Sequence, residues 1–256
     1  APRVEVEDGS RDDVGMVEVR VERTLPHRFC HSQTIACDET IFSAIETNSD
    51  GQTYPFLASE GDMVRFTLGE VVGSAGTFSP SWRVIDATGN GFGGCGSFAS
   101  VSRNSCGPFP AAGSPYAVQV TDGSLNATGE YAIYMHRLTS SRACDQTDLT
   151  CGEPSTGTLG SIVDSNLHAF SVPEQETVRV SLAIPVPAPH LSLEWRLIDG
   201  AGNPAPSCGT FTLAASADCP DLPAYRNPYR VEVQDSFHDG QGDYEVRVDF
   251  LTSGCP

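Results

Sequence analysis

Nine cysteines are the residues with the most evident chemistry in this 256-residue chain, because their spacing repeats. Two gaps between cysteines are seven positions long and two are eleven positions long. This spacing predicts four disulfides, Cys30–Cys37, Cys95–Cys106, Cys144–Cys151 and Cys208–Cys219. Zinc is the competing chemistry, but zinc sites favour tighter C-x-x-C pairs, and no histidine recurs beside these cysteines. Because disulfides persist in oxidising compartments, we predict an extracellular or cell-surface location.

Cys255 is left over in this scheme, and it stands where Cys30 and Cys144 stand in their own repeats. One interpretation is that the chain is part of a longer array of repeats, with the partner of Cys255 about seven residues further on. The other is a disulfide to a second molecule. We favour the first and leave Cys255 as an unpaired or inter-repeat cysteine.

Carboxylates near the C-terminus are the best candidates for a metal site. Asp235, Asp239 and Asp243 lie close together in a turn-rich stretch, and calcium binds several converging oxygens. The alternative is that Asp235 closes a β-hairpin through an Asx turn, since Asp8 and Asp122 follow similar strands. We favour the turn. Calcium is therefore the single cofactor left open, and no metal is firmly predicted.

Catalytic patterns are missing from the sequence. No G-x-S-x-G or H-E-x-x-H motif occurs, and no histidine recurs at the same place in both repeats. Gly89, Gly91 and Gly94 spell G-x-G-x-x-G, but no helical pattern follows, so we expect a glycine-rich turn. Trp82 and Trp195 alternate with apolar residues, which favours core packing over a ligand platform. The chain is predicted not to be an enzyme.

The charge excludes several classes of partner. The formal net charge is −18, and all 15 basic residues are arginine. Duplex DNA and anionic membranes require a basic face, so we expect neither nucleic-acid binding nor membrane insertion. No run of 18 apolar residues occurs, and the opening residues 1–10 do not resemble a signal peptide.

The cysteine positions reveal an internal repeat. Subtracting those of the first copy from those of the second gives 114, 114, 113 and 113. Other segments agree: PSWRVIDATGN at 80–90 matches LEWRLIDGAGN at 193–203. The predicted organisation is the last part of a preceding repeat at 1–29, one whole repeat at 30–143 and another at 144–256.

The elements that must position these residues are strands. TVRVSLAI at 177–184 and DYEVRVDF at 243–250 alternate apolar and polar residues with a period of two. Clusters of Gly, Pro, Asn and Asp separate such runs, and no helical stripe of useful length appears. We predict an all-β chain of tandem antiparallel β-sandwich repeats, jelly-roll-like and about 114 residues long.

The strand motifs resemble the bacterial pre-peptidase C-terminal domain. They are HAFSV, TVRVSL, LSLEWRLID, YRVEVQD and GDYEVRV in the last repeat, with counterparts in the one before. The resemblance implies a jelly-roll sandwich in secreted bacterial proteins, where some relatives bind calcium, collagen or carbohydrate. The chain departs from the family at Pro115 and Pro228, where glycine is usual, and in its paired cysteines. A bacterial source would also leave the sequon at Asn126 without a glycan.

Together these features predict a non-catalytic extracellular structural protein, a segment of a surface array or filament built from disulfide-stapled sandwiches. Its expected partners are other copies of itself, arranged head to tail. The alternative is an adhesive module that holds a secreted enzyme on collagen, polysaccharide or another surface. Residues 1–29 contain two alternating strands without a sheet of their own, so we expect them to contact another copy or continue into one, near Cys255.

Overall fold

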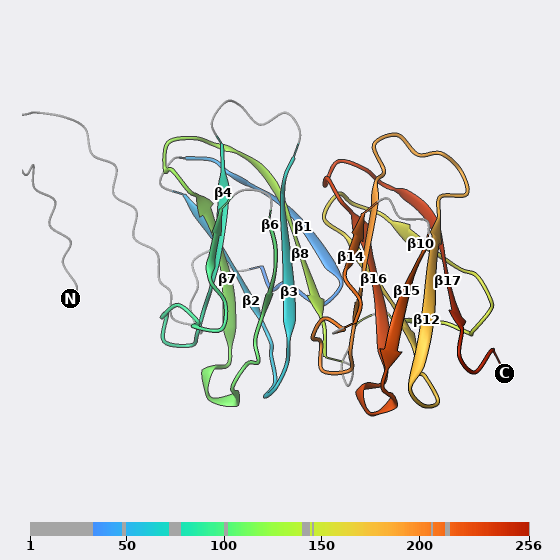
Figure 1. Cartoon of the computed structure of the whole chain (residues 1–256). Helices are drawn as coiled ribbons and strands as arrows, with labels where there is room; N and C mark the ends of the chain where they lie inside the picture. The colour runs from blue at the N-terminus through green and yellow to red at the C-terminus, as the bar shows by residue number, and fades with distance from the viewer. Residues whose placement is uncertain are drawn as a thin grey trace, which may run out of the picture.

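The computed structural model describes residues 33–47, 50–71, 78–99, 102–139, 144, 146–205, 207–212 and 216–255. These residues form two β-sandwiches that lie side by side (Figure 1). Apart from strands, they include two 3₁₀ turns, Ala111–Gly113 and Ala224–Arg226. The prediction of an all-β chain of antiparallel sandwiches is confirmed.

The first sandwich contains sheets with the strand orders β1–β8–β3–β6 and β2–β7–β4–β5, all antiparallel. Two four-stranded sheets in this order form a jelly roll. The strands are β1 (Glu39–Ile45), β2 (Gly51–Phe56), β3 (Val64–Glu70), β4 (Pro80–Ile85), β5 (Ser97–Ala99), β6 (Ser102–Cys106), β7 (Tyr116–Asp122) and β8 (Gly129–Arg137).

The second sandwich repeats this order as β10–β17–β12–β15 and β14–β13–β16–β11, with β9 added in parallel beside β11. Its strands are β9 (Thr147–Asp148), β10 (Ser155–Leu159), β11 (Ser165–Phe170), β12 (Glu176–Ala183), β13 (Leu193–Ile198), β14 (Thr210–Thr212), β15 (Ser216–Leu222), β16 (Tyr229–Asp235) and β17 (Gly242–Phe250). The predicted segment 1–29 lies outside the described residues.

Each sandwich has its own apolar core, built by the alternation seen in the sequence. On β12, Val178, Val180 and Leu182 are buried, while Arg179 between them is exposed. Trp82 and Trp195 are the largest buried side chains of the two cores, at 1% and 0% exposure. Both tryptophans therefore pack in the core, as the pattern predicted.

The glycine-rich stretch after β4 is a turn. The Asp86 carboxylate accepts hydrogen bonds from the backbone N–H groups of Thr88 and Asn90, at 2.8 and 3.1 Å. Gly89 has a φ of +85°, which favours glycine. The motif thus closes a strand connection and does not precede a helix.

The disulfides differ from the predicted pairs at two of four places. Cys95–Cys106 and Cys208–Cys219 form as the spacing predicted, but Cys37 joins Cys144 and Cys151 joins Cys255. The pairs Cys30–Cys37 and Cys144–Cys151 are therefore wrong, and Cys255 is bonded within the chain. Cys30 itself lies outside the described residues.

Strand order explains why two of the disulfides differ from the predicted pairs. In each sandwich the first and last strands are antiparallel neighbours, so the residues before the first lie beside those after the last. The Cα atoms of Cys37 and Cys144 are 5.9 Å apart, and those of Cys151 and Cys255 are 5.3 Å apart. Each bridge therefore closes its own repeat, whereas the sequence spacing alone favoured small loops at the junctions.

Candidate functional site: the interface between the two repeats

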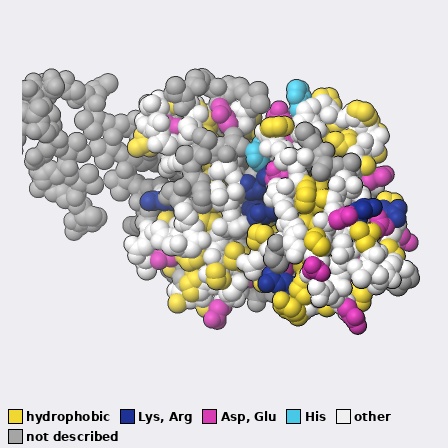
Figure 2. All heavy atoms as spheres, viewed as in Figure 1, with side chains coloured by type: hydrophobic (Ala, Val, Ile, Leu, Met, Phe, Trp, Pro, Cys, Tyr) yellow, Lys and Arg dark blue, Asp and Glu magenta, His cyan; other side chains and the backbone are white. Residues whose placement is uncertain are grey.

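The two sandwiches meet through sheet faces. The outward side chains of β1–β8–β3–β6 form what we call the covered face, and the outward side chains of β14–β13–β16–β11 form the receiving face. The centres of both faces are dry: Arg65 is 3% exposed, His136 0%, and Arg230 and Glu232 0%. Figure 2 shows dark blue basic side chains and a histidine where the two halves meet. Charged residues are rarely this buried unless they are paired.

Glu232 on β16 is the centre of this interface. Its Oε2 accepts hydrogen bonds from Arg65 of the first repeat and from Arg196 on the neighbouring strand β13. Arg65 also donates to the Ser105 hydroxyl on β6, at 3.2 Å from Nε. One carboxylate therefore joins a guanidinium from each repeat.

A second contact lies beside the first. Arg103 on β6 reaches Glu194 on β13, with 3.3 Å between Nη1 and Oε1. It also donates to the backbone carbonyl of Asp235, at 3.2 Å. Burial lowers the pKa of Arg103, and the carboxylates of Glu232, Glu194 and Asp235 act against that shift. Basic side chains of the covered face thus meet acidic side chains of the receiving face.

Other buried polar groups complete the centre. The Tyr134 hydroxyl lies 2.7 Å from the Ser165 carbonyl oxygen, and His136 Nδ1 lies 3.1 Å from the same atom. Burial lowers the pKa of His136, which favours the neutral ring. Burial also lowers the pKa of Arg230 to about 10, while its Nη2 donates to the Asp199 carbonyl at 2.8 Å.

Apolar clusters lie on both sides of the polar centre. One contains Ala132, Tyr134 and Val163, with Val71 and Ile162 packed against them. The other contains Leu138, Leu167 and Ile198, with Met63. A Cβ at Gly69 would lie 2.8 Å from Val163 Cγ1, so glycine at this position permits the close approach of the two repeats.

The equivalent of the covered face in the second repeat is exposed. We call the outward side chains of β10–β17–β12–β15 the C-terminal face. Arg65 lies opposite His136 and Ser105 in its sheet, and Arg179 lies opposite Asp249 and Asp218 in its own. The Arg179 side chain is 46% exposed and pairs with Asp218, at 2.7 Å from Nε.

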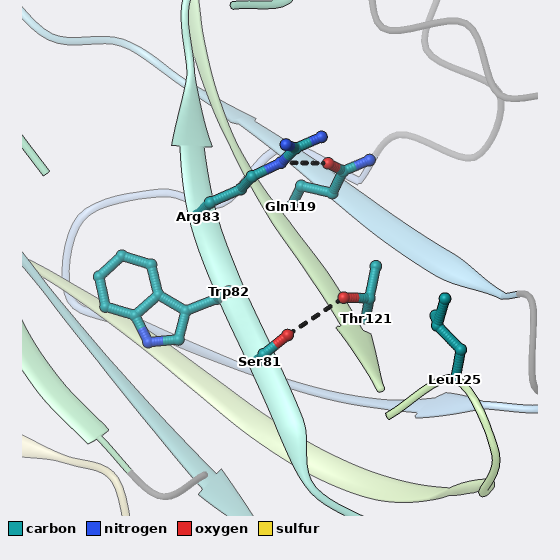
Figure 3. A pocket seen from close by; sticks show the side chains of 6 residues that line it. All are labelled: Ser81, Trp82, Arg83, Gln119, Thr121 and Leu125. Carbon is teal, nitrogen blue, oxygen red and sulfur yellow. Dashed lines mark hydrogen bonds between the residues drawn. The ribbon is translucent and has the colours of Figure 1, made fainter. Parts of the chain in front are cut away.

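The equivalent of the receiving face in the first repeat carries an open cavity. We call the outward side chains of β2, β7 and β4 the N-terminal face. Arg83 lies opposite Gln119 as Arg196 lies opposite Glu232. The cavity has a volume of about 300 Å³ and is lined by Ser81, Trp82, Arg83, Gln119, Thr121 and Leu125. Figure 3 shows Arg83 bonded to Gln119, and Ser81 to Thr121, on the side of the sheet opposite Trp82.

The three aspartates proposed for calcium bond to separate groups. Asp235 accepts hydrogen bonds from the backbone N–H of Ser192, Asp239 and Gly240, at 2.8, 2.9 and 3.1 Å. Asp243 instead accepts one from the Thr158 hydroxyl, at 2.6 Å. Within the described residues, no group of three or more His, Cys, Asp or Glu is arranged to hold a metal ion.

The same turn occurs in the first repeat. Asp122 accepts from the backbone N–H of Ser79, Asn126 and Ala127, and these bonds hold its pKa below the usual range against the desolvation caused by burial. The hairpin interpretation therefore describes both aspartates. No helix in the described part of the chain is long and apolar enough to cross a membrane.

The interface residues are not among the predicted sites, although the sequence contains a signal for them. On β17 the outward positions are Glu245, Arg247 and Asp249, a regular polar series. On β8 the corresponding positions are Ala132, Tyr134 and His136, and six consecutive residues are buried. The lost alternation marks a sheet that is covered on both sides.

Comparison with known proteins gives likenesses to solved structures. No family model and no curated protein matches the chain. It is similar to the pre-peptidase C-terminal domain of collagenase from Bacillus anthracis, with 18% identity, 42% of this chain and 97% of that chain covered, and a TM-score of 0.33. It is also similar to the CBM22-1-CBM22-2 tandem domain of Paenibacillus barcinonensis Xyn10C, with 9% identity, coverage of 83% and 91%, and a TM-score of 0.28.

A third likeness is to the CUB1-EGF-CUB2 domain of human MASP-1/3, with 10% identity, coverage of 81% and 99%, and a TM-score of 0.20. The first of the three belongs to the family that the strand motifs resemble. At these TM-scores none of the likenesses assigns a function. The fold of the chain rests on its own strand order, which is that of tandem jelly-roll sandwiches.

Proposed function

We propose that the protein is a non-catalytic, extracellular structural segment, in which jelly-roll repeats are stacked face to face into a stiff array. The observation that carries this proposal is the burial of Arg65 and Glu232 against each other across the two repeats. Domains within one chain are usually mobile relative to each other, unless the interface between them is extensive and well packed.

The buried charges support a fixed orientation. An ion pair removed from water gives little net stability, but separating its members inside the interface leaves two uncompensated charges. Sliding one repeat over the other would separate Arg65 from Glu232 and Arg103 from Glu194. The orientation of the two repeats in the structure is therefore favoured over orientations in which one repeat is shifted along the other.

The disulfides support the location. Four bridges lie among the described residues, two of them closing whole repeats. Bridges of this kind persist in secreted and cell-surface proteins and are rare in the reducing cytosol. Repeats that are closed by disulfides and joined through a buried interface are suited to an extracellular array that bears mechanical load.

Electron microscopy of the full chain at high concentration tests the proposal. We expect straight rods in which sandwiches follow each other at a constant spacing. Isolated two-lobed particles at every concentration would overturn the array and leave a monomeric module.

A second candidate function is an adhesive module, and the cavity near Arg83 favours it. The cavity of about 300 Å³ is open and lined by hydroxyl, amide and guanidinium groups. Such groups hydrogen-bond to the hydroxyls of a polysaccharide. Binding of immobilised polysaccharide by the monomer, lost in Arg83→Ala and retained in Glu60→Ala, would favour this candidate over the array.

A further inference from the structure

We propose that the interface between the two repeats is an acid-sensitive switch, which opens when His136 and His238 gain protons. This inference deepens the proposed function and rests on it, because it concerns the control of the interface that would make the array stiff. One histidine comes from each repeat: His136 lies on β8 of the first, and His238 follows β16 of the second.

His238 lies between a group of its own repeat and a group of the other. Its Nδ1 is 3.3 Å from Arg103 Nη2 of the first repeat and 3.3 Å from the Ile162 carbonyl oxygen of the second. A neutral ring with no proton on Nδ1 accepts a hydrogen bond from Arg103, whereas a protonated ring only donates, and Ile162 is the acceptor beside it. Protonation therefore exchanges a hydrogen bond across the interface for one within the second repeat, and it places two positive charges next to each other.

The surroundings of His238 oppose its protonation while the interface is closed. Burial and then the Arg103 guanidinium lower the pKa of His238 to about 4. The Ile162 carbonyl and the carboxylates of Asp235 and Asp239 act in the opposite direction without outweighing the burial. Separating the repeats removes Arg103 and exposes the ring to water, so the open molecule binds the proton more readily.

His136 places a second titratable ring at the centre of the interface. Its Nδ1 lies 3.1 Å from the Ser165 carbonyl oxygen of the other repeat, an acceptor that requires a proton on this nitrogen, and 2.9 Å from the Tyr134 hydroxyl. Among the described residues, the buried Nε2 has no hydrogen-bond partner. A neutral ring leaves only a lone pair unpaired there, whereas a protonated ring would bury a charged N–H without an acceptor.

Charged groups of both repeats surround His136. Burial is the largest of the effects on its pKa, which it lowers. Glu232 on β16 favours the charged ring, and Arg230 on the same strand opposes it. Within the first repeat, the Asp38 carboxylate is 4.0 Å from Nδ1, and Arg65 lies opposite His136 in the sheet. The closed interface therefore holds this ring neutral although two carboxylates lie near it.

The two repeats are built so that they can separate without unfolding. Each sandwich has an apolar core of its own, with Trp82 in one and Trp195 in the other. The chain passes from the first sandwich to the second once, between β8 and β9. Protonation of the two histidines acts on the polar interface and leaves both cores unchanged.

The direction and steepness of the response follow from proton binding. In the open molecule both rings are in water and bind protons below about pH 6.5, whereas the closed molecule binds them only at lower pH. The interface is therefore most stable above that pH and weakens as the pH falls. Each histidine raises the equilibrium constant for opening by up to about tenfold per pH unit, so the two together raise it by up to about a hundredfold.

Small-angle X-ray scattering of the dilute full-length chain, from about pH 7 to 4, tests the inference. We expect the radius of gyration of the wild type to increase reversibly as the pH falls. Tryptophan emission should stay constant, because Trp82 and Trp195 are 1% and 0% exposed in the cores. The double variant His136→Gln with His238→Gln keeps polar side chains at both places but cannot titrate there, so it should stay compact over the same range.

A single variant and a control make the test quantitative. His238→Gln alone should leave a steepness of at most about tenfold per pH unit, and it remains informative if the double variant does not fold. His190→Gln is the matched control, because the His190 side chain is 73% exposed on the connection between β12 and β13. This control should expand at the same pH as the wild type.

The outcomes separate this inference from the proposed function. If the wild type stays compact at every pH, the switch is wrong and the stiff array stands. If the double variant expands at the same pH as the wild type, carboxylates such as Glu232 and Glu194 titrate instead, and the switch is again wrong. An expansion that accompanies a shift in tryptophan emission is unfolding and likewise overturns it. A wild type that is already extended at neutral pH contradicts the proposed function itself.

Discussion

The sheets β1–β8–β3–β6 and β10–β17–β12–β15 share one strand order but meet different surroundings. The centre of the first is buried on both sides, with the Arg65 side chain 3% exposed and bonded to Glu232 of the other repeat. The second has one side open, with the Arg179 side chain 46% exposed and bonded to Asp218 of its own sheet. The same residue type at the same place is thus an interface anchor in one repeat and a surface group in the other.

This difference shows that the residue types at the outward positions of a sheet depend on what covers that side of the sheet. The inward positions are apolar in both repeats because both sandwiches need a core. The outward positions of β8, Ala132, Tyr134 and His136, suit contact with a second sheet, whereas Glu245, Arg247 and Asp249 on β17 suit water or a charged neighbour. The fold itself requires no particular residue types at these outward positions. Their residue types instead suit whatever lies against the sheet, either a second sheet or water.

Removing the bridge that closes the second repeat should have the largest effect. Cys151→Ser with Cys255→Ser opens a loop of 104 residues, which in the chain-entropy treatment costs about 4–5 kcal/mol. Removing Cys208–Cys219, with a separation of 11, should cost roughly 3 kcal/mol. Urea unfolding of both double variants measures the difference. Equal losses would show that loop length does not set the contribution of these bridges.

Glu232→Gln should break the covered interface. It removes the charge that Arg65 and Arg196 share and leaves the guanidinium of Arg65 buried without a carboxylate, so we expect a loss of about 3 kcal/mol in the free energy of unfolding. Asp218→Asn is the matched control, because it removes the partner of the exposed Arg179 and should leave the free energy of unfolding close to that of the wild type. Similar costs for the two changes would mean that the interface ion pair is solvated.

The two cores differ at one polar pair, which predicts a pH dependence. In the first repeat the Tyr54 and Tyr131 hydroxyls lie 2.5 Å apart, and in the second His168 Nε2 lies 2.7 Å from the Tyr244 hydroxyl. Burial lowers the pKa of His168 to about 4, from 6.5. Between these values the unfolded chain binds more protons than the folded one, so stability falls as the pH decreases from 6.5 to 4.

His168→Tyr copies the first repeat and should reduce this acid sensitivity. The decrease in the free energy of unfolding that His168 causes is at most about 3 kcal/mol near pH 4 and vanishes above pH 7. Urea unfolding from pH 4 to 7 compares the variant with the wild type. His238, whose pKa burial also lowers to about 4, keeps part of the slope in both chains. An unchanged slope in the variant would show that His168 is not buried as a neutral ring.

Removing calcium should have the smallest effect. The carboxylate of Asp235 is bonded to three backbone N–H groups, which close its turn without a cation. We expect a chelator to change the melting temperature by less than about 3 °C, or under about 1 kcal/mol. A larger decrease, restored by added calcium, would show that Asp235, Asp239 and Asp243 bind the ion.

The sequence predicts the repeat, the strands and the jelly-roll-like sandwich, because alternation at positions such as Val178 to Leu182 reflects burial directly. It also predicts the Cys95–Cys106 and Cys208–Cys219 bridges, since the two cysteines of each pair are only 11 residues apart and this spacing recurs in both repeats. The bridge between Cys37 and Cys144 could not be read from spacing, because it depends on which strands pair at the edge of a sheet. The contact between Arg65 and Glu232 depends on how two sheets stack. The alternation of residues along one strand does not show which other sheet packs against it.

We infer that the buried interface makes the two repeats one rigid body. Spin labels at Leu125 and Phe237, which are 60% and 67% exposed in equivalent turns of the two repeats, measure this directly through the distance between them. Labels attached by non-cysteine chemistry leave the disulfides intact. We predict a single narrow distance distribution that broadens in Glu232→Gln. A broad distribution in the wild-type chain, unchanged by that substitution, would contradict the account.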